Sequence, residues 1–170
     1  MRGFTLLEMM TTLAIFGLVA TLSIASLGPL RDRYNHQHAV QMVSGAIVRA
    51  QLLARESGRC HSVEVVDDDG VTNTTAFRRR LRIQRRSTAN CDGATAAPFV
   101  EVESLRLPDG TTFRIDTANG VMEFRPNGRQ KSGTSVLVVV RGRATPSDLN
   151  IVAAKQGRVC VDVANLGACP

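Results

Sequence analysis

The sequence contains no tryptophan and a single tyrosine, and aromatic residues make up only 4% of its 170 positions. Side chains on which nucleic-acid bases could stack are therefore scarce. The four cysteines include no C-x-x-C pair, which excludes the usual spacing of zinc sites and thiol redox motifs. No nucleophile, base and orienting group occur at the spacing of a known catalytic motif. The sequence also lacks a phosphate-binding Gly-rich loop and paired metal ligands. We therefore expect no enzymatic activity, no cofactor and no bound metal.

Charge is missing from a long N-terminal run, residues 9–28, which holds twenty consecutive uncharged and mostly apolar positions. At about 1.5 Å per residue, such a helix can cross a hydrocarbon core of roughly 30 Å. A signal peptide or a simple membrane anchor is the plainer alternative, but the apolar region of a signal peptide is only about 7–15 residues long. Glu8 precedes the run, and an unpaired carboxylate is costly in lipid, so Glu8 needs a cationic partner.

Residues 3–8 read Gly-Phe-Thr-Leu-Leu-Glu. This N-terminus resembles that of type IV pilins and type II secretion pseudopilins, position by position. The resemblance implies that a membrane-embedded prepilin peptidase cuts between Gly3 and Phe4 and methylates the new Phe4 amine. It also implies that Glu8 pairs with the N-terminal amine of a neighbouring subunit, an attraction that is far stronger in a low dielectric than in water. The leader is short, only residues 1–3, and carries one positive charge. Either this chain has an unusually short leader or the true translation start lies upstream.

An amphipathic helix is predicted to continue the apolar run. Pro29 can kink a helix because it lacks the N–H group, yet the apolar pattern resumes directly after it. The apolar positions recur at intervals of three and four, at Val40, Val43, Ile47, Ala50 and Ala54. We expect this helix to end at Gly58 and to lay its apolar stripe against a sheet.

Eight short β-rich runs, separated by turn residues, follow the helix. They cover residues 61–66, 77–86, 99–107, 112–116, 121–125, 135–141, 149–153 and 158–163. The sequence thus predicts an α+β fold, in which a long N-terminal helix, membrane-spanning in its first half, packs on an antiparallel β head of two sheets. The predicted organisation is a prepilin leader at 1–3, a transmembrane and assembly helix at 4–28, its amphipathic continuation at 29–57 and a periplasmic head at 58–170.

The later strands carry a second resemblance. Residues 121–128 read VMEFRPNG, and residues 151–159 read IVAAKQGRV. Together with the β-run between them, they resemble the GspH/FimT-type head, which has an F-x-P-x-G turn and a closing strand that ends in Gly-Arg. The resemblance leaves the middle of the head, roughly residues 67–109, unassigned.

Isolated candidates for metal ligands have simpler interpretations. His36 and His38 are two residues apart on a helix and do not face each other, so we expect both to be solvated. His61 has no evident partner. Residues 67–69 are three aspartates, but the spaced ligands and distal Glu of an EF-hand are missing, so an acidic turn is expected.

The four cysteines, Cys60, Cys91, Cys160 and Cys169, all lie outside the apolar run. An even number in a translocated domain suggests disulfides, and four cysteines allow three connectivities. We favour Cys60 with Cys91 and Cys160 with Cys169, because each pair brackets a probable hairpin or loop. The alternative is four unpaired core thiols.

Basic residues outnumber acidic ones, giving a formal net charge of +6, and the excess lies on the head. Strand alternation over residues 77–86 places Arg78, Arg80 and Arg82 on one face, about 6.6–6.8 Å apart. Such a row could follow a phosphate backbone. The alternative is a solvated strand or a strand that protects a sheet edge with its charges.

Some FimT-type minor pilins bind DNA during natural transformation through a Gly-Arg-x-Arg motif near the C-terminus. Gly157, Arg158 and Val159 match this motif, but Cys160 stands where the second Arg would be. This departure weakens the resemblance to the DNA-binding members, and Arg158 remains the candidate contact.

Taken together, these features predict a minor pilin or pseudopilin, a structural component of a type II secretion pseudopilus or type IV pilus. We expect a single-pass protein of the bacterial inner membrane, with its head in the periplasm and with prepilin peptidase and other pilin or pseudopilin subunits as partners. One alternative is a pilus-associated minor pilin that binds DNA in DNA uptake. Another is an anchored periplasmic protein that never assembles.

Overall fold

The computed structural model describes residues 5–67, 76–87, 91, 99–117, 120–132, 136–143, 149–153 and 159–162. They form one long helix, α1, and eight strands. The elements are α1 (Leu6–Ser57), β1 (His61–Val66), β2 (Arg80–Arg86), β3 (Phe99–Arg106), β4 (Thr111–Asp116), β5 (Val121–Phe124), β6 (Val136–Gly142), β7 (Leu149–Ala153) and β8 (Val159–Asp162).

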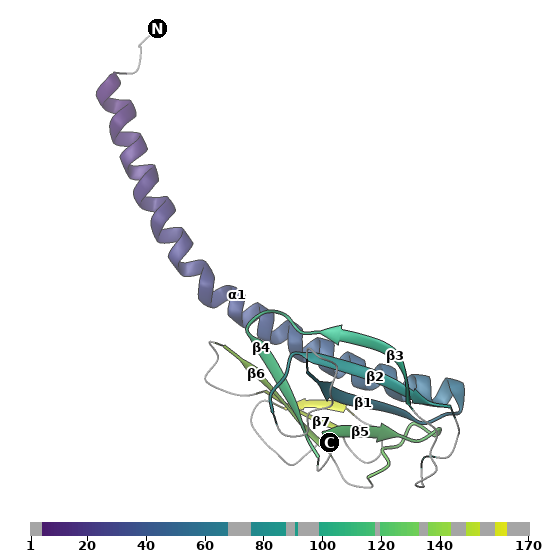
Figure 1. Ribbon diagram of the computed structural model, residues 1–170. Helices are drawn as coiled ribbons and strands as arrows, with labels where there is room; N and C mark the ends of the chain where they lie inside the picture. The colour runs from purple at the N-terminus through teal and green to yellow at the C-terminus, as the bar shows by residue number, and fades with distance from the viewer. Residues whose placement is uncertain are drawn as a thin grey trace.

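Helix α1 begins and ends where local chemistry favours a helix boundary. Thr5 has an extended backbone, and its side chain accepts a hydrogen bond from the backbone N–H of Glu8, which satisfies one of the free amide groups of the first turn. Gly58 follows the last turn with φ 61° and ψ 24°, the left-handed conformation that glycine adopts without a steric penalty. Pro29 lies inside the helix, which continues past it (Figure 1).

The strands form two four-stranded sheets in which every neighbouring pair is antiparallel. The first sheet has the order β3-β2-β1-β5 and the second the order β4-β6-β7-β8. The second half of α1 lies along the sheets, and its first half projects away from the head (Figure 1). The predicted fold class, a long helix on an antiparallel head of two sheets, is confirmed.

The core lies where α1 meets the sheets. All five residues of the predicted apolar stripe are buried, with Ile47, Ala50 and Ala54 completely inaccessible to solvent. They pack with large side chains of both sheets, among them Phe113 and Phe124. The amphipathic half of the helix therefore joins the two sheets into one head.

The second strand begins later than predicted. Its expected range was 77–86, but β2 starts at Arg80. Arg78 instead exchanges backbone hydrogen bonds with Phe113 of β4, at 3.0 and 2.8 Å. The segment before β2 thus connects the first sheet to the second rather than extending the first.

The expectation that His36 is solvated is wrong, and His61, for which no partner was evident, is buried too. His36 is buried, 3% exposed, and its Nε2 lies 3.1 Å from the carbonyl oxygen of Val140 in β6. His61 is also buried, and its Nδ1 lies 3.2 Å from the carbonyl oxygen of Arg59. Only His38 is exposed as expected. An imidazole ring can be buried between a helix and a neighbouring strand when a backbone carbonyl oxygen accepts its hydrogen bond.

Within the described residues, no helix reaches the length and hydropathy that define a candidate membrane-crossing segment. That the first half of α1 spans a bilayer stays a prediction.

Candidate assembly site and basic surfaces

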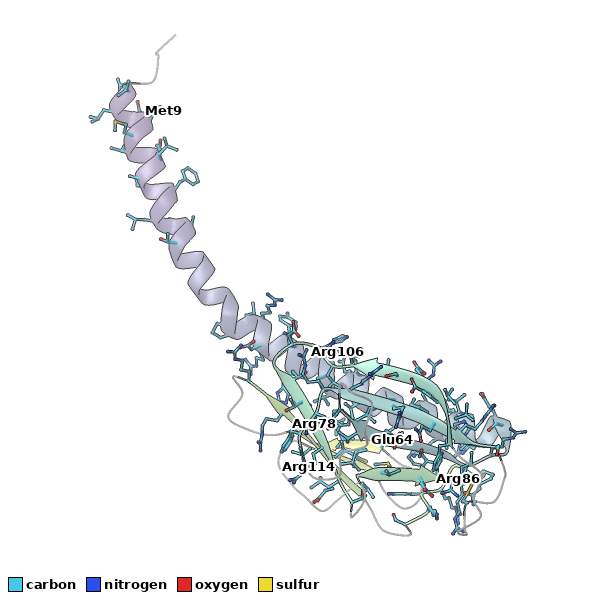
Figure 2. The ribbon with its side chains drawn as sticks, in the orientation of Figure 1. Met9, Glu64, Arg78, Arg86, Arg106 and Arg114 are labelled. Atoms are coloured by element: carbon cyan, nitrogen blue, oxygen red, sulfur yellow. A yellow bond between two sulfur atoms is a disulfide. The ribbon has the colours of Figure 1, made fainter. Side chains whose placement is uncertain are left out.

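The first half of α1 exposes large apolar side chains on every side (Figure 2). Nine such residues between positions 6 and 19 are each 56–79% exposed. They are Leu6, Leu7, Met9, Met10, Leu13, Ile15, Phe16, Leu18 and Val19. A contiguous exposed apolar surface of this kind marks contact with a membrane or with another protein. This half of the helix is thus a candidate docking surface.

Glu8 lies at the start of this apolar surface, one turn into the helix. Its side chain is exposed, and no ion pair joins it to any residue that the structure describes. The hydroxyl groups of Thr11 and Thr12 each donate a hydrogen bond of 3.0 Å to the backbone carbonyl oxygen of Glu8. Neither hydroxyl therefore contacts the Glu8 carboxylate. Gly3 and Phe4, the predicted processing residues, lie outside the described residues. The carboxylate is left available for a cation from another molecule.

The arginine row is not at a sheet edge. Strand β2 lies between β3 and β1, so the interpretation of residues 77–86 as an edge-protecting strand is wrong. The predicted alternation holds in the strand itself, because Leu81 and Ile83 are buried in the core while Arg80 and Arg82 are only partly buried. The arginines thus lie over the middle of a sheet, where carboxylates of neighbouring strands can reach them.

The first two arginines of the row have partners within the head. Arg78 forms an ion pair with Asp67, which follows β1, so this aspartate of the expected acidic turn has a cationic partner. Arg80 donates from Nε to the hydroxyl of Ser104 in β3, at 3.0 Å. Asp68 and Asp69 lie outside the described residues. The guanidinium groups of Arg78 and Arg80 are held against the head and not extended into solvent.

Arg82 and Arg86, the other arginines considered in β2, pair with glutamates of other strands of the same sheet. Arg82 lies 2.5 Å from Glu64 of β1 and 3.8 Å from Glu101 of β3. Arg86 lies 3.2 Å from Glu123 of β5. A cross-strand carboxylate next to each guanidinium lowers the positive potential that would attract a phosphate backbone. Arg158, the remaining candidate for DNA contact, lies outside the described residues.

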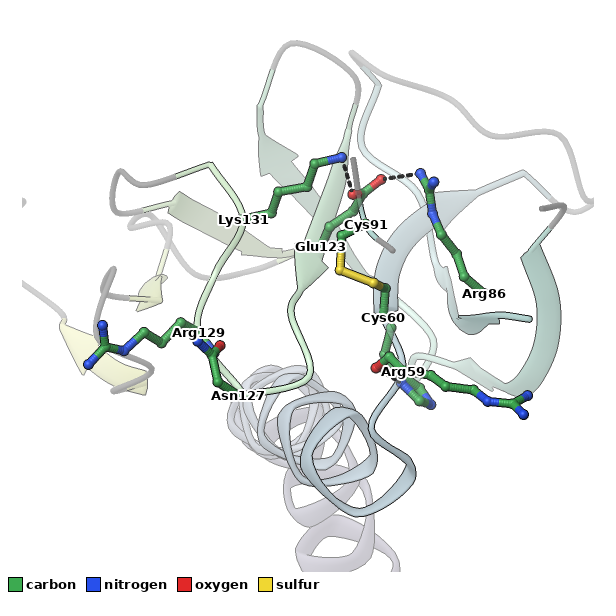
Figure 3. The surroundings of a disulfide bond; sticks show 9 residues. Arg59, Cys60, Arg86, Cys91, Glu123, Asn127, Arg129 and Lys131 are labelled. Carbon is green, nitrogen blue, oxygen red and sulfur yellow. Dashed lines mark hydrogen bonds and ion pairs between the residues drawn. A yellow bond between two sulfur atoms is a disulfide. The ribbon is translucent and has the colours of Figure 1, made fainter. Parts of the chain in front are cut away.

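A disulfide between Cys60 and Cys91 ties the end of the helix to the chain after β2 (Figure 3). The two Cα atoms are 5.7 Å apart, and 31 positions separate the residues in sequence. This bond is one of the two predicted. Cys160 is also disulfide-bonded, whereas Cys169, its predicted partner, lies outside the described residues. The alternative of unpaired thiols is wrong for the cysteines that the structure describes, since none of them is free.

His61 gives the head a titratable group next to this disulfide. Burial, which disfavours the charged form, lowers the pKa of His61 from its usual 6.5, and the nearby charge of Arg85 lowers that pKa further, while the hydrogen bond to Arg59 opposes both. His61 is therefore neutral in the folded protein near neutral pH.

We expect the head to lose stability as the pH falls below about 6.5. A histidine whose pKa is lower when folded binds more protons when unfolded, so its contribution is present above pH 6.5 and disappears as the pH falls through the folded-state value. Urea unfolding across this range measures the effect. His61→Gln should flatten the pH dependence, and His38→Gln, at an exposed position, should leave it unchanged; the same slope in both variants would contradict the assignment.

A further group of charged residues, which sequence reasoning missed, lies where α1 leaves the head. Asn35 donates from its side-chain nitrogen to the carbonyl oxygen of Asp109, at 3.2 Å, and so docks the β3–β4 turn on the helix. Arg79 forms an ion pair with the carboxylate of Asp109. Nothing in the spacing of these residues signals the contact, because 74 positions separate Asn35 from Asp109.

The N-terminal motif and the fold both have counterparts among known proteins. Residues 1–24 match the family model for the prokaryotic N-terminal methylation motif. The structure resembles the type IV minor pilin FimU of Pseudomonas aeruginosa, with 14% sequence identity and a TM-score of 0.58 over 78% of this chain and 92% of that chain. The chain thus combines a prepilin-type N-terminal motif with a fold similar to that of a type IV minor pilin.

This pilin-like chain also resembles the minor pseudopilin EpsH from the type 2 secretion system of Vibrio cholerae. The sequence identity is 12% and the TM-score 0.52, over 76% of this chain and 97% of that chain. No curated protein sequence matches the chain. The resemblance to pilins and pseudopilins that the N-terminal residues predicted is confirmed, and the structural likeness extends it to the fold of the head.

Proposed function

We propose that this pilin-like chain is a minor pilin or pseudopilin, a structural subunit of a type II secretion pseudopilus or a type IV pilus. Residues 4–28 hold it in the bacterial inner membrane, with the head in the periplasm, until it is incorporated. The observation that carries the proposal is the exposed apolar half of α1, with Glu8 one turn from its start.

This half-helix needs a cover, because its nine large apolar side chains face solvent. Lipid tails provide such a cover before assembly, and the corresponding helices of neighbouring subunits provide it afterwards. Neither environment suits an unpaired carboxylate, so Glu8 requires a cation. Cleavage by prepilin peptidase would expose an amine at Phe4 that is positively charged. In a neighbouring subunit this amine lies at the start of the same helix, close to the position of Glu8 along the chain.

Replacing Gly3 with leucine is expected to abolish maturation, because a bulky side chain would occupy the position at which the peptidase accepts only a small residue. Intact-mass measurement of the chain from cells that contain the peptidase tests this. The mature wild-type chain should lack residues 1–3 and carry one added methyl group.

Gly17→Leu is the matched control. It makes the same change within the apolar helix, where a Cβ atom at Gly17 would meet nothing within 4 Å. This variant should mature normally. Normal maturation of Gly3→Leu would refute the assignment of the cleavage site.

DNA uptake is the second candidate, and the described geometry does not favour it. Arg78, Arg80 and Arg82 have partners within the head. A phosphate backbone would have to compete with these carboxylates and the Ser104 hydroxyl. The structural role needs no such rearrangement, since its site is already exposed.

A further inference from the structure

Four exposed arginines gather at the end of the head from which the apolar half of α1 projects. Arg31 and Arg33 come from the helix, Arg106 from the end of β3, and Arg143 from the residue after β6. Figure 2 shows Arg106 beside the helix at this junction. Thr111, the first residue of β4, pairs with Gly142, which places Arg143 at the same end as the β3–β4 turn. We call these four residues the junction arginines.

A cavity of about 350 Å³, lined mainly by charged and polar residues, opens between the helix and the head at this junction. Arg31, Asp32 and Asn35 line it from the helix, and Asp109 and Arg143 line it from the head. The hydrogen bond from Asn35 to the Asp109 carbonyl fixes the two walls relative to each other. The cavity is thus a built feature of the fold with an arginine on each side.

The carboxylates in this cavity form no ion pair with Arg31 or Arg143 in the part of the chain that the structure describes. Asp109 is engaged by Arg79, whose hydrogen bond and charge lower the pKa of Asp109, with smaller contributions from the charges of Arg106 and Arg31. Asp32 is the other carboxylate in the lining. Among the described residues, neither Arg31 nor Arg143 donates a hydrogen bond or joins an ion pair. The cavity therefore presents two exposed guanidinium groups that form no hydrogen bond or ion pair with the described residues.

The position of the junction arginines along the helix matches the headgroup layer of a bilayer. Arg31 lies three residues beyond Gly28 and Arg33 five, which at 1.5 Å per residue is about 4.5 and about 7.5 Å past the end of the uncharged run. The headgroup region of one leaflet is roughly 5–8 Å thick outside a hydrocarbon core of about 30 Å. If residues 9–28 fill the hydrocarbon core, these guanidinium groups lie among the lipid phosphates.

We propose that the junction arginines and the cavity between them bind the phosphate of an anionic phospholipid headgroup, with Arg31 and Arg143 as the principal contacts. Guanidinium groups donate paired hydrogen bonds that match phosphate oxygens. The contact orients the head on the membrane surface before the subunit is incorporated. This inference rests on the proposed function, because it requires the helix to be anchored in a bilayer.

An acidic surface of a neighbouring subunit is the competing partner for the same charges. The position of the cavity favours lipid, because the cavity begins at Gly28, the last residue of the uncharged run. An incoming subunit would have to reach into the headgroup layer to contact Arg31.

Native mass spectrometry of the full chain in neutral detergent micelles with equal phosphatidylglycerol and phosphatidylcholine tests the proposal. We expect preferential retention of phosphatidylglycerol. Each basic residue near an anionic surface contributes about a five-fold preference, so Arg31→Gln with Arg143→Gln should reduce the retention ratio by about twenty-five-fold. Both positions are exposed, so circular dichroism should show an unchanged head.

The control is Arg59→Gln with Arg129→Gln, which removes the same charge from the opposite end of the head, where Arg59 adjoins Cys60 and Arg129 lies near Asn127 (Figure 3). This variant should retain the wild-type preference. In a further arm, excess inorganic phosphate should not displace phosphatidylglycerol, because the micelle that surrounds the helix holds the lipid next to the proposed site.

Three results would overturn the inference: no preference in the wild-type chain, an equal loss in both double variants, or displacement of the lipid by inorganic phosphate. The first result would assign the junction arginines to an acidic subunit. Failure of this inference is separable from failure of the proposed function, since a chain that is processed and assembled without lipid preference refutes only the lipid site. A chain with lipid preference that is never incorporated refutes only the structural role.

Discussion

Replacing Glu8 with alanine is expected to reduce incorporation of the chain into its pilus or pseudopilus by about a hundredfold or more. In the proposed assembly, the carboxylate is surrounded by apolar helices and paired with the amine of a neighbouring subunit. Removing one partner of a buried ion pair leaves the other charge uncompensated, at a cost of about 3–5 kcal/mol. Cleavage after Gly3 should continue, so processed chains should accumulate in the membrane.

Quantitative immunoblotting of sheared filaments, compared with the membrane fraction, measures the effect. Glu56→Ala is the matched control, because Glu56 is an exposed glutamate at the other end of the same helix. That variant should incorporate at the wild-type level. Unchanged incorporation of Glu8→Ala would favour an anchored protein that never assembles through this residue.

Patterns with a short period predicted most of the fold. Alternation and turn residues placed all eight strands, and two of them, residues 61–66 and 149–153, have the predicted bounds. The recurrence of apolar residues at three and four predicted the buried stripe of α1. These features are local, since each depends on residues that are neighbours along the chain.

The partners of the charged residues were not predictable in the same way. Periodicity correctly placed Arg80 and Arg82 on one face of a strand, but the carboxylates that neutralise that face belong to other strands. Glu64 precedes Arg82 by 18 positions, and Glu123 follows Arg86 by 37. Sheet order, which is a property of the whole head, decides these contacts.

His36 illustrates the same limit for a single residue. Its spacing from His38 correctly excluded a shared metal, yet the spacing could not show that β6 would pass beside it. The carbonyl oxygen that satisfies its ring belongs to Val140, 104 positions away. A polar residue next to an apolar stripe is solvated or buried according to which strand covers it, and only the tertiary structure determines that.

Replacing Cys60 and Cys91 together with alanine is expected to lower the free energy of unfolding of the head by about 3–4 kcal/mol. The bond closes a loop of 31 positions, and in the chain-entropy model its loss increases the conformational freedom of the unfolded chain. Domains of this size are stable by only about 5–15 kcal/mol, so a large fraction of the stability depends on this bond. Urea unfolding of the full chain in neutral micelles, without reductant, measures the difference.

Alanine separates this effect from the effect of burying new polar groups. Cys60 and Cys91 are only 1% and 5% exposed, so serine at both positions would add two buried hydroxyl groups and should destabilise the head further. We therefore expect the order of stability to be wild type, then the alanine pair, then the serine pair. A loss below about 1 kcal/mol in the alanine pair would contradict the chain-entropy account. Such a small loss would mean that the unfolded chain near these residues has little conformational freedom even without the bond. The disulfide would then serve mainly to fix the position of the end of α1 relative to β1.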